Sequence, residues 1–443
     1  MEIEVVFFSI GIITIIGYVA SNIFDRTGIP DTPFLILLGF IGATALSRTA
    51  SGFDRTGLDF IAPYLAGLAI AVILFNGGMY LKIRQVIEET PRGFFVTATS
   101  VIITIITLTA VGYFINEYIL DNAWGRGPNA IFASLFFASA LCGTSSAVII
   151  PLVSKLKINK KAETFLTIES AFTDVFVVVL SVTILSIWTG GSSGVSGSSL
   201  LLQEMSGRFS IGIVFGILGG LIWLKILQSF PTRIGRISSQ QDVVHDDILT
   251  LTTMLMLFGF SEMSGGNGAL AALCFGLVLG NGKEFGFIPS FRTNPVDAGS
   301  LMRKFQGQIS FLLATFFFVY LGMIFVPTVP ILLLGIVVTV LLIGARNLSF
   351  RITLKNDKSM MKDLRLLSSM LPRGLAAAAV SQLPATPKYK DSLEKIYGEG
   401  TILLGMQELV ISVIIFSVVA AAIGSFVYGR SEEPEVKETP SRS

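Results

Sequence analysis

Charged residues are scarce in this chain, and their scarcity excludes an ordinary water-soluble protein. Asp, Glu, Lys and Arg make up 14% of its 443 residues, whereas hydrophobic residues make up 52%. A soluble globular domain carries roughly a quarter charged residues. The composition therefore predicts an integral membrane protein. The net charge of +2 gives no reason to expect nucleic acid or another polyanion as a partner.

Histidine and cysteine are scarce as well, which removes most metal and cofactor chemistry. The chain has one histidine, His245, and two cysteines, Cys142 and Cys274. Without a Cys/His cluster there is little basis for a zinc or haem site, and we expect no cofactor. Both cysteines stand in apolar surroundings, where packing is the simpler role. No nucleophile–base–orienter set stands at membrane depth, so we do not expect an enzyme.

Long apolar runs dominate the chain instead. A membrane-spanning helix needs about 20 mainly apolar residues, and the sequence offers about thirteen candidates. The first run has no basic stretch before it, so we interpret it as a span rather than a cleaved signal. Residues 1–428 then form the membrane domain, and the charged residues 429–443 a disordered cytoplasmic tail. The candidate spans are 4–22, 31–47, 60–80, 95–116, 129–153, 163–188, 208–229, 246–261, 267–282, 308–326, 329–352, 364–383 and 402–427.

The basic residues predict the orientation. Most of the 32 Lys and Arg fall in loops on one side if the N-terminus is outside and the C-terminus is cytoplasmic, as the positive-inside rule requires. We therefore expect a multi-pass protein of the cell (cytoplasmic) membrane, in contact with the lipid bilayer. Two arginines fit no loop, because Arg346 lies inside the eleventh span and Arg373 inside the twelfth. Arginines at membrane depth need partners.

Two spans carry signals that interrupt a helix. The fifth reads NAIFASLFFASALCGTSSAVIIPLV, with glycine, a run of hydroxyl residues and a proline near mid-membrane, all of which weaken a helix. The twelfth repeats the theme in MLPRGLAAAAVSQLP. A merely kinked helix is the simpler interpretation of one such span. A break in each half of the chain, however, is typical of transporters built from inverted repeats, with the site where the breaks cross.

Two carboxylates, Glu169 and Asp174, stand in the sixth span. Each costs at least about 2.5–3.5 kcal/mol at membrane depth and is functional by default unless it is paired. Ser170 and Asp174 are four residues apart and share a helix face, whereas Glu169 and Thr173 share a neighbouring face. One face can therefore turn toward the break in the fifth span and the other toward an arginine on another helix.

This arrangement separates two roles. If Glu169 pairs with either deep arginine, Asp174 is left as an acid that faces water and can exchange a proton for a cation, because burial favours the protonated carboxyl. Oxygens of Ser170, Thr144 and nearby carbonyls suit a hard monovalent ion. Arg373 can be stabilised by free carbonyls of its own broken helix. The alternative is that both carboxylates only lock helices together through the arginines.

The order of three stretches, GTSSAVIIPLV, ESAFTD and PRGLAAAA, resembles the monovalent cation:proton antiporters, in particular the archaeal and bacterial sodium/proton antiporters related to sodium/hydrogen exchangers. The resemblance covers about residues 5–425. It implies an all-α membrane fold of thirteen helices with inverted repeats. It also implies a homodimer with a dimerisation part and a core, here approximately 95–188 and 329–427, in which the fifth and twelfth helices unwind and cross.

The resemblance also implies roles for particular residues. It makes Asp174 the carboxylate that binds cation or proton, with Ser170 and Thr144 as Na+ ligands. Ser145 and Thr173 stand directly beside these positions in the two motifs, and we include them in the candidate cation site.

A second set of residues supports this site. The resemblance favours Arg346 over Arg373 as the partner of Glu169, and we expect Arg373 and Asn76 to support the pathway or the crossover. The chain departs from the family pattern, with Thr-Ser-Ser at 144–146 for Thr-Asp-Pro, Thr-Asp at 173–174 for Asn-Asp, and Asn at 76 for Glu. Two acids expected near the pathway are thus neutral, which favours electroneutral one-for-one exchange.

We therefore expect an antiporter that exchanges Na+, or Li+ or K+, for protons and serves pH homeostasis. The alternatives are a potassium/proton antiporter and an organic anion symporter on a similar broken-helix fold, which would need a roomier apolar pocket. A non-transporting sensor or a channel subunit is a further rival. His245 stands beside two aspartates, where a solvated helix start is the simpler interpretation and pH sensing is the alternative.

Overall fold

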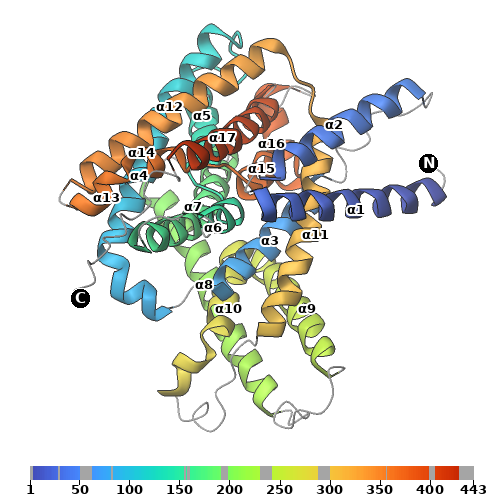
Figure 1. The fold of residues 1–443 in the computed structure, drawn as a ribbon, viewed down its shortest axis with the longest axis vertical. Coiled ribbons are helices and arrows are strands. Elements are labelled where there is room, and N and C mark those ends of the chain that lie inside the picture. Colours follow the sequence, from blue (N-terminus) through green and yellow to red (C-terminus); the bar gives the residue numbers. More distant parts are fainter. Residues whose placement is uncertain are drawn as a thin grey trace, which may run out of the picture.

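The computed structural model of the chain describes residues 3–27, 30–49, 62–80, 83–153, 156, 160–190, 198–229, 242–287, 300–355, 357–398 and 405–428. Within these ranges every regular element is a helix (Figure 1), which confirms the all-α prediction. The predicted tail 429–443 lies outside the described residues, as does the side chain of His245. The helices are α1 (Ile3–Thr27), α2 (Thr32–Thr49), α3 (Ala62–Tyr80), α4 (Ile83–Tyr118), α5 (Pro128–Ala140), α6 (Ser146–Val153), α7 (Lys160–Gly190), α8 (Ser198–Ser229), α9 (Asp242–Met263), α10 (Gly268–Gly280), the 3-10 helix η3 (Gly282–Phe287), α11 (Ser300–Ile324), α12 (Val329–Thr353), α13 (Lys358–Lys362), α14 (Leu364–Ser369), α15 (Leu375–Ser381), the 3-10 helix η5 (Leu383–Ala385), α16 (Pro387–Tyr397) and α17 (Met406–Tyr428).

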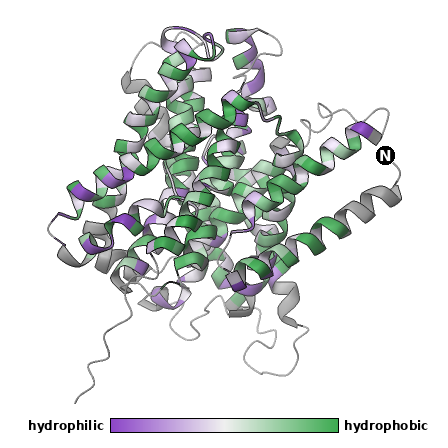
Figure 2. Cartoon of the chain, turned by 45° about the horizontal axis from the view of Figure 1, so that its top comes forward, coloured by the Kyte–Doolittle hydropathy of each residue, from purple (hydrophilic) through white to green (hydrophobic). Residues whose placement is uncertain are grey.

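Apolar helices make up most of the fold, as Figure 2 shows by their hydropathy. In the described residues, six helices are long and apolar enough to cross a membrane, namely α4, α7, α8, α11, α12 and α17. Shorter apolar helical segments occur in α1, α2, α3, α5 and α10 and over Leu375–Ala385. The composition of these helices agrees with the predicted membrane protein. The ninth candidate span is the short helix α10.

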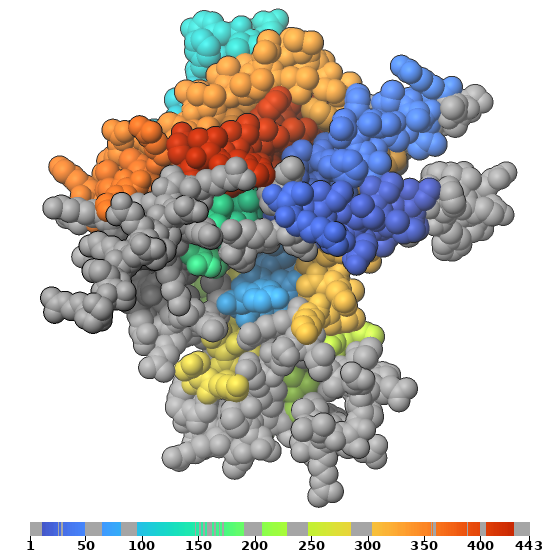
Figure 3. Space-filling model, in the orientation of Figure 1, coloured from blue at the N-terminus to red at the C-terminus, as the bar shows by residue number. Residues whose placement is uncertain are grey.

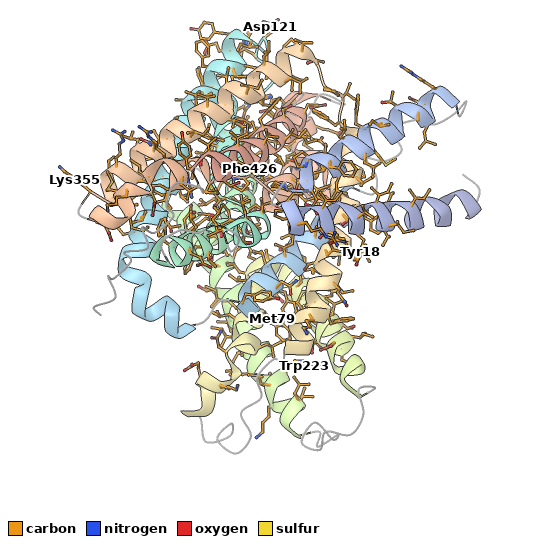
Figure 4. The ribbon with its side chains drawn as sticks, in the orientation of Figure 1. Tyr18, Met79, Asp121, Trp223, Lys355 and Phe426 are labelled. Carbon is orange, nitrogen blue, oxygen red and sulfur yellow. The ribbon has the colours of Figure 1, made fainter. Side chains whose placement is uncertain are left out.

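The helices form two packed groups (Figure 1). In one group, α4 packs on α5 and α12, α5 and α15 pack on α7, and α12 packs on α17. In the other, α10 lies against α3, α8 and α9, while α11 lies against α2 and α3. Asp121, in the turn after α4, lies at the top of the view in Figure 4, and Trp223 of α8 lies in its lower part. The surface of α12 and α17 lies next to that of α1 and α2 (Figure 3), and α17 contacts α2.

The fifth span is interrupted between α5 and α6. Helix α5 ends at Ala140 and α6 begins at Ser146. Gly143 suits the break because a Cβ there would lie 2.6 Å from the carbonyl oxygen of Thr173, so any side chain would clash with α7. Pro151, expected to help cause the break, lies within α6 instead. The glycine and the hydroxyl residues therefore mark the interruption more closely than the proline does.

The twelfth span is interrupted between α14 and α15, and this break meets the first one. Helix α14 ends at Ser369 and α15 begins at Leu375, with non-helical chain between them. The backbone N–H of Ser145 donates to the carbonyl of Pro372 over 2.7 Å. Gly374 lies directly against Ser145, which leaves no room for a Cβ. The two interrupted segments are thus joined through their backbones.

Helix α16 is a polar helix that the apolar runs did not predict. Pro at its first turn fits the helix start, and its aromatic side chains hold it to the α5 and α7 ends. The hydroxyl of Tyr397 donates to the carbonyl of Trp124 over 2.9 Å, and its ring packs edge-on against Trp188 at 5.8 Å between centroids. The hydroxyl of Tyr389 lies 3.3 Å from that of Ser186. Three segments distant in sequence, namely α16, the turn before α5 and the end of α7, therefore meet at one end of the fold.

Candidate functional site

One unbroken helix, α7, carries both carboxylates past the break in the fifth span. Of the side chains of interest, Glu169 is 1% exposed and Asp174 is 8% exposed, while Ser170 and Thr173 are fully buried. A helix turns about 100° per residue, so the two carboxylates leave α7 in different directions. Helices α5 and α6, which stand on either side of the break, both pack on α7. The two acids consequently have different partners.

Glu169 forms a bidentate ion pair with Arg346 of α12. Nη1 lies 2.8 Å from Oε1 and Nη2 lies 2.8 Å from Oε2. Arg346 is 4% exposed, and its Nε donates to the carbonyl of Leu367 over 3.0 Å. Its guanidinium also stands 4.6 Å above the ring of Phe350, a favourable cation–π geometry. The charge count had left Arg346 and Arg373 as alternatives, and the structure places Arg346 on Glu169.

Thr144 connects the break to this ion pair. Its hydroxyl donates to Oε2 of Glu169 over 3.3 Å and lies 3.2 Å from the hydroxyl of Thr173. The backbone N–H of Thr144 donates to the Thr173 hydroxyl over 3.0 Å. This bond satisfies a donor that the broken helix leaves unpaired. The structure therefore groups Thr144 and Thr173 with Glu169 and gives neither a hydrogen bond to Asp174.

Asp174 takes its hydrogen bonds from Ser146, the first residue of α6. The Ser146 backbone N–H lies 3.1 Å from Oδ2 and the Ser146 hydroxyl lies 2.5 Å from the same oxygen. Within the described part of the chain, no lysine, arginine or histidine nitrogen lies within the 4.0 Å of an ion pair with Asp174. The carboxylate is thus buried, hydrogen-bonded and not neutralised by a paired cation.

Two predicted ligands do not reach Asp174 in this arrangement. The hydroxyl of Ser170 donates to the carbonyl of Thr167 on its own helix over 3.1 Å, so it does not point with Asp174 toward the break as we had expected. A serine hydroxyl inside a helix commonly bonds the preceding turn in this way. Ser145 is buried and is held to the twelfth span by its backbone.

Arg373 connects the two interrupted segments. Its Nη1 donates to the carbonyl of Gly143, which the end of α5 leaves without a helical partner. Its backbone N–H donates to the Ser417 hydroxyl of α17 over 2.9 Å. The expectation that its own broken helix would supply the carbonyl was wrong, because the non-helical chain at 370–374 turns the side chain toward the other break.

Asn76 makes its hydrogen bonds between α3 and α11 and, among the described residues, none with the two carboxylates. Its Nδ2 donates to the carbonyl of Gln306 over 3.0 Å and also to the Ser310 hydroxyl. The side chain of Gln306 in turn donates to the carbonyl of Asp247 on α9 over 3.3 Å. Asn76 is therefore placed to hold three helices together rather than to touch the candidate site.

Sequence reasoning missed three partners at the site: Ser146, Ser417 and the Gly143 carbonyl. Ser146 had no signal of its own, because it is the last of three successive hydroxyl residues and the sequence does not show which of them faces the acid. Ser417 had none, because hydroxyl residues are frequent in packed membrane helices.

The geometry gives the two acids different chemistry. Glu169 is held by two charge-assisted hydrogen bonds, which are among the strongest in proteins, and can only change charge by breaking them. Asp174 has no such constraint, so it can take up or release a positive charge with only the Ser146 hydrogen bonds to adjust.

The chain is similar in sequence to known ion antiporters. The profile described as sodium/hydrogen exchanger, transmembrane, matches residues 11–427. The K(+)/H(+) antiporter NhaP2 of Shewanella oneidensis is 26% identical over 277 residues, covering 62% of this chain and 44% of that protein. This match therefore spans less than half of the relative. Na(+)/H(+) antiporter 1 of Methanocaldococcus jannaschii is 25% identical over 400 residues, covering 86% and 83%.

A solved structure shares the fold. The sodium proton antiporter MjNhaP1 from Methanocaldococcus jannaschii superimposes with a TM-score of 0.73 at 20% sequence identity, covering 97% of this chain and 100% of that structure.

Proposed function

Because the chain belongs to the transmembrane sodium/hydrogen exchanger family, we propose that it exchanges a monovalent cation, Na+ in the first place, for a proton at Asp174. One observation carries the proposal. Of the two carboxylates on α7, Glu169 is neutralised by Arg346 over 2.8 Å, whereas Asp174 is paired with no cation among the described residues. An uncompensated carboxylate in a membrane core is costly unless it binds a positive ion or a proton.

The exchange follows from charge balance at one group. When Asp174 is ionised, a cation bound to it neutralises the site, and when Asp174 is protonated the site is neutral without a cation. Each ligand displaces the other, so one proton is exchanged for one monovalent cation. Ser170 and Thr144 are the proposed hydroxyl ligands, with Ser145 and Thr173 beside them, after their hydroxyls turn from the backbone and the Glu169 carboxylate. Oxygen ligands of this kind suit hard cations.

The proposed architecture has thirteen spans, with α5 and α6 counted as one broken span and α14 and α15 as another. Residues 95–188 and 329–427 form the proposed core, which moves against a scaffold that dimerises. We place the N-terminus outside and the C-terminus in the cytoplasm of the cell membrane, on the distribution of basic loops. The packing of α4–α7 with α12–α17 supports this division.

Potassium/proton exchange is the second candidate. It is favoured by the relatives named K(+)/H(+) antiporter NhaP2. The Na(+)/H(+) antiporter 1 of Methanocaldococcus jannaschii matches far more of the chain at a similar identity, and this broader match is the reason to place Na+ first.

The test is transport in proteoliposomes that carry an imposed pH gradient and a pH-sensitive dye. Addition of Na+, K+ or Li+ in turn should dissipate the gradient for the transported ion, at a rate that an imposed membrane potential does not change. Asp174→Asn should abolish the exchange. Asp391→Asn, at an exposed aspartate of α16, is the matched control and should exchange normally. Exchange by Asp174→Asn at the wild-type rate would refute the proposed role of Asp174.

A further inference from the structure

Ser146 places two hydrogen-bond donors on a single oxygen of Asp174. Both its N–H and its hydroxyl point at Oδ2, over 3.1 and 2.5 Å. Among the described residues no donor is placed on Oδ1. Because Ser146 is the first residue of α6, its N–H has no acceptor within that helix. Its direction is therefore set by the backbone rather than by a rotatable side chain.

Two donors on Oδ2 make this oxygen a poor place for a proton or a cation. The hydroxyl can rotate away and become an acceptor, but the backbone N–H cannot. Both donors also stabilise the ionised carboxylate, since hydrogen bonds to the charged form favour that form. Oδ1 is left as the oxygen that a proton and a cation must share.

We propose that Ser146 is a positioning residue that holds Oδ2 and so forces proton and cation to compete for Oδ1 of Asp174. The inference rests on the proposed function. Ser146 departs from the family pattern resembled above, which has proline at this position, and proline has neither the N–H nor the hydroxyl. In the exchange step, the Oδ1–H bond breaks as the Oδ1–cation contact forms, and the proton leaves to water, while both Ser146 bonds to Oδ2 remain.

Other charged groups act on Asp174 as well, and they remain unchanged in a Ser146 variant. Glu169 on α7 and Arg373 before α15 both interact with it electrostatically, and Arg346 neutralises Glu169. Several further titratable groups have described side chains and lie on the elements that pack against α7. They are Tyr64 and Tyr80 of α3, Tyr113, Glu117 and Tyr118 of α4, Cys142 after α5, Cys274 of α10, and Tyr389, Lys390, Asp391, Glu394, Lys395 and Tyr397 of α16.

The experiment compares three substitutions at one position. Ser146→Ala removes the hydroxyl donor, Ser146→Pro removes both donors, and Ser146→Thr keeps both. Exchange is measured in proteoliposomes as a function of pH. In parallel, infrared difference spectra of the purified proteins follow the carboxylic C=O band that Asp174→Asn eliminates. We expect the midpoint of both titrations to move to higher pH by about one unit in Ser146→Ala, a tenfold rise in proton affinity. Ser146→Pro should move further, and Ser146→Thr should remain at the wild-type midpoint.

The outcomes separate this inference from the proposed function. A wild-type protein that exchanges no cation refutes the proposed function, while the infrared titration still reports the effect of Ser146. Exchange that is slower at every pH in Ser146→Ala, with both midpoints unchanged, would show a merely structural role and overturn the inference. Should Ser146→Pro fail to purify as a monodisperse protein, the difference between the alanine and threonine variants decides the question.

Discussion

The Glu169–Arg346 pair offers a prediction whose size can be worked out from its contacts. Glu169→Ala leaves the Arg346 guanidinium, which is 4% exposed, with the Leu367 carbonyl at 3.0 Å and the Phe350 ring at 4.6 Å as its partners. Removing one member of a buried ion pair costs about 3–5 kcal/mol. The remaining cation–π contact is worth about 0.5–2 kcal/mol and is present before and after the substitution. We therefore expect a loss of about 3–5 kcal/mol in stability.

The measurement is the thermal unfolding midpoint of the purified protein in detergent, with the sodium preference of exchange determined in parallel. Glu169→Ala should lower the midpoint strongly. The control Glu163→Gln should not, because Glu163 lies on the same helix and its carboxylate forms no ion pair in the described part of the chain. The double variant Glu169→Gln, Arg346→Met should regain much of the loss, because it leaves no unpaired buried charge.

The reasoning fails if the double variant is as unstable as the sum of its single variants, because the two charges would then not be coupled. It also fails if Glu169→Ala keeps the wild-type midpoint but changes the preference among Na+, K+ and Li+. That result would move Glu169 from the structural ion pair into the cation site.

Two further predictions concern regions away from the carboxylates. Asn76→Leu should cost about 0.5–1.5 kcal/mol of stability, the net contribution of a hydrogen bond, because the Gln306 carbonyl loses the Asn76 donor but remains an acceptor within α11; an unchanged thermal midpoint would contradict the role of Asn76 between α3 and α11. Tyr397→Phe should cost about 1 kcal/mol through the lost bond to Trp124. Burial raises the pKa of Tyr397 above its ordinary 10.0, so its contribution is fully present below the unfolded value and is lost as the pH rises through the folded value. The difference in thermal midpoint between wild type and variant should therefore stay constant below about pH 10. A difference that already decreases near neutral pH would contradict this role of the Tyr397 hydroxyl.

The sequence predicted what depends on local composition and missed what depends on how helices rotate against one another. Apolar runs located most helices, and the cost of charge in lipid singled out Glu169 and Asp174. Counting charges could not choose between Arg346 and Arg373, because the choice depends on which helix face meets α7. The apolar runs did not predict the polar helix α16, because it is too short and too charged to resemble a membrane span. The hydrogen bonds of Ser146 to Asp174 were not predicted, because a run of hydroxyl residues does not show which of them faces the acid.

The hydrogen bonds between the two interrupted segments restrict how the protein can move. Arg373 reaches from one break to the Gly143 carbonyl of the other, and Ser145 reaches back to the Pro372 carbonyl. These two hydrogen bonds join the interrupted spans, so neither α5–α6 nor α14–α15 can slide along its own axis without breaking a bond to the other. Asp174 is hydrogen-bonded to these joined segments through Ser146 of α6. A displacement that opens the acid first to one side of the bilayer and then to the other would carry these joined segments together. The contacts that change would then include those of α15 with α3 and α11, of α7 with α3 and α10, and of α17 with α2.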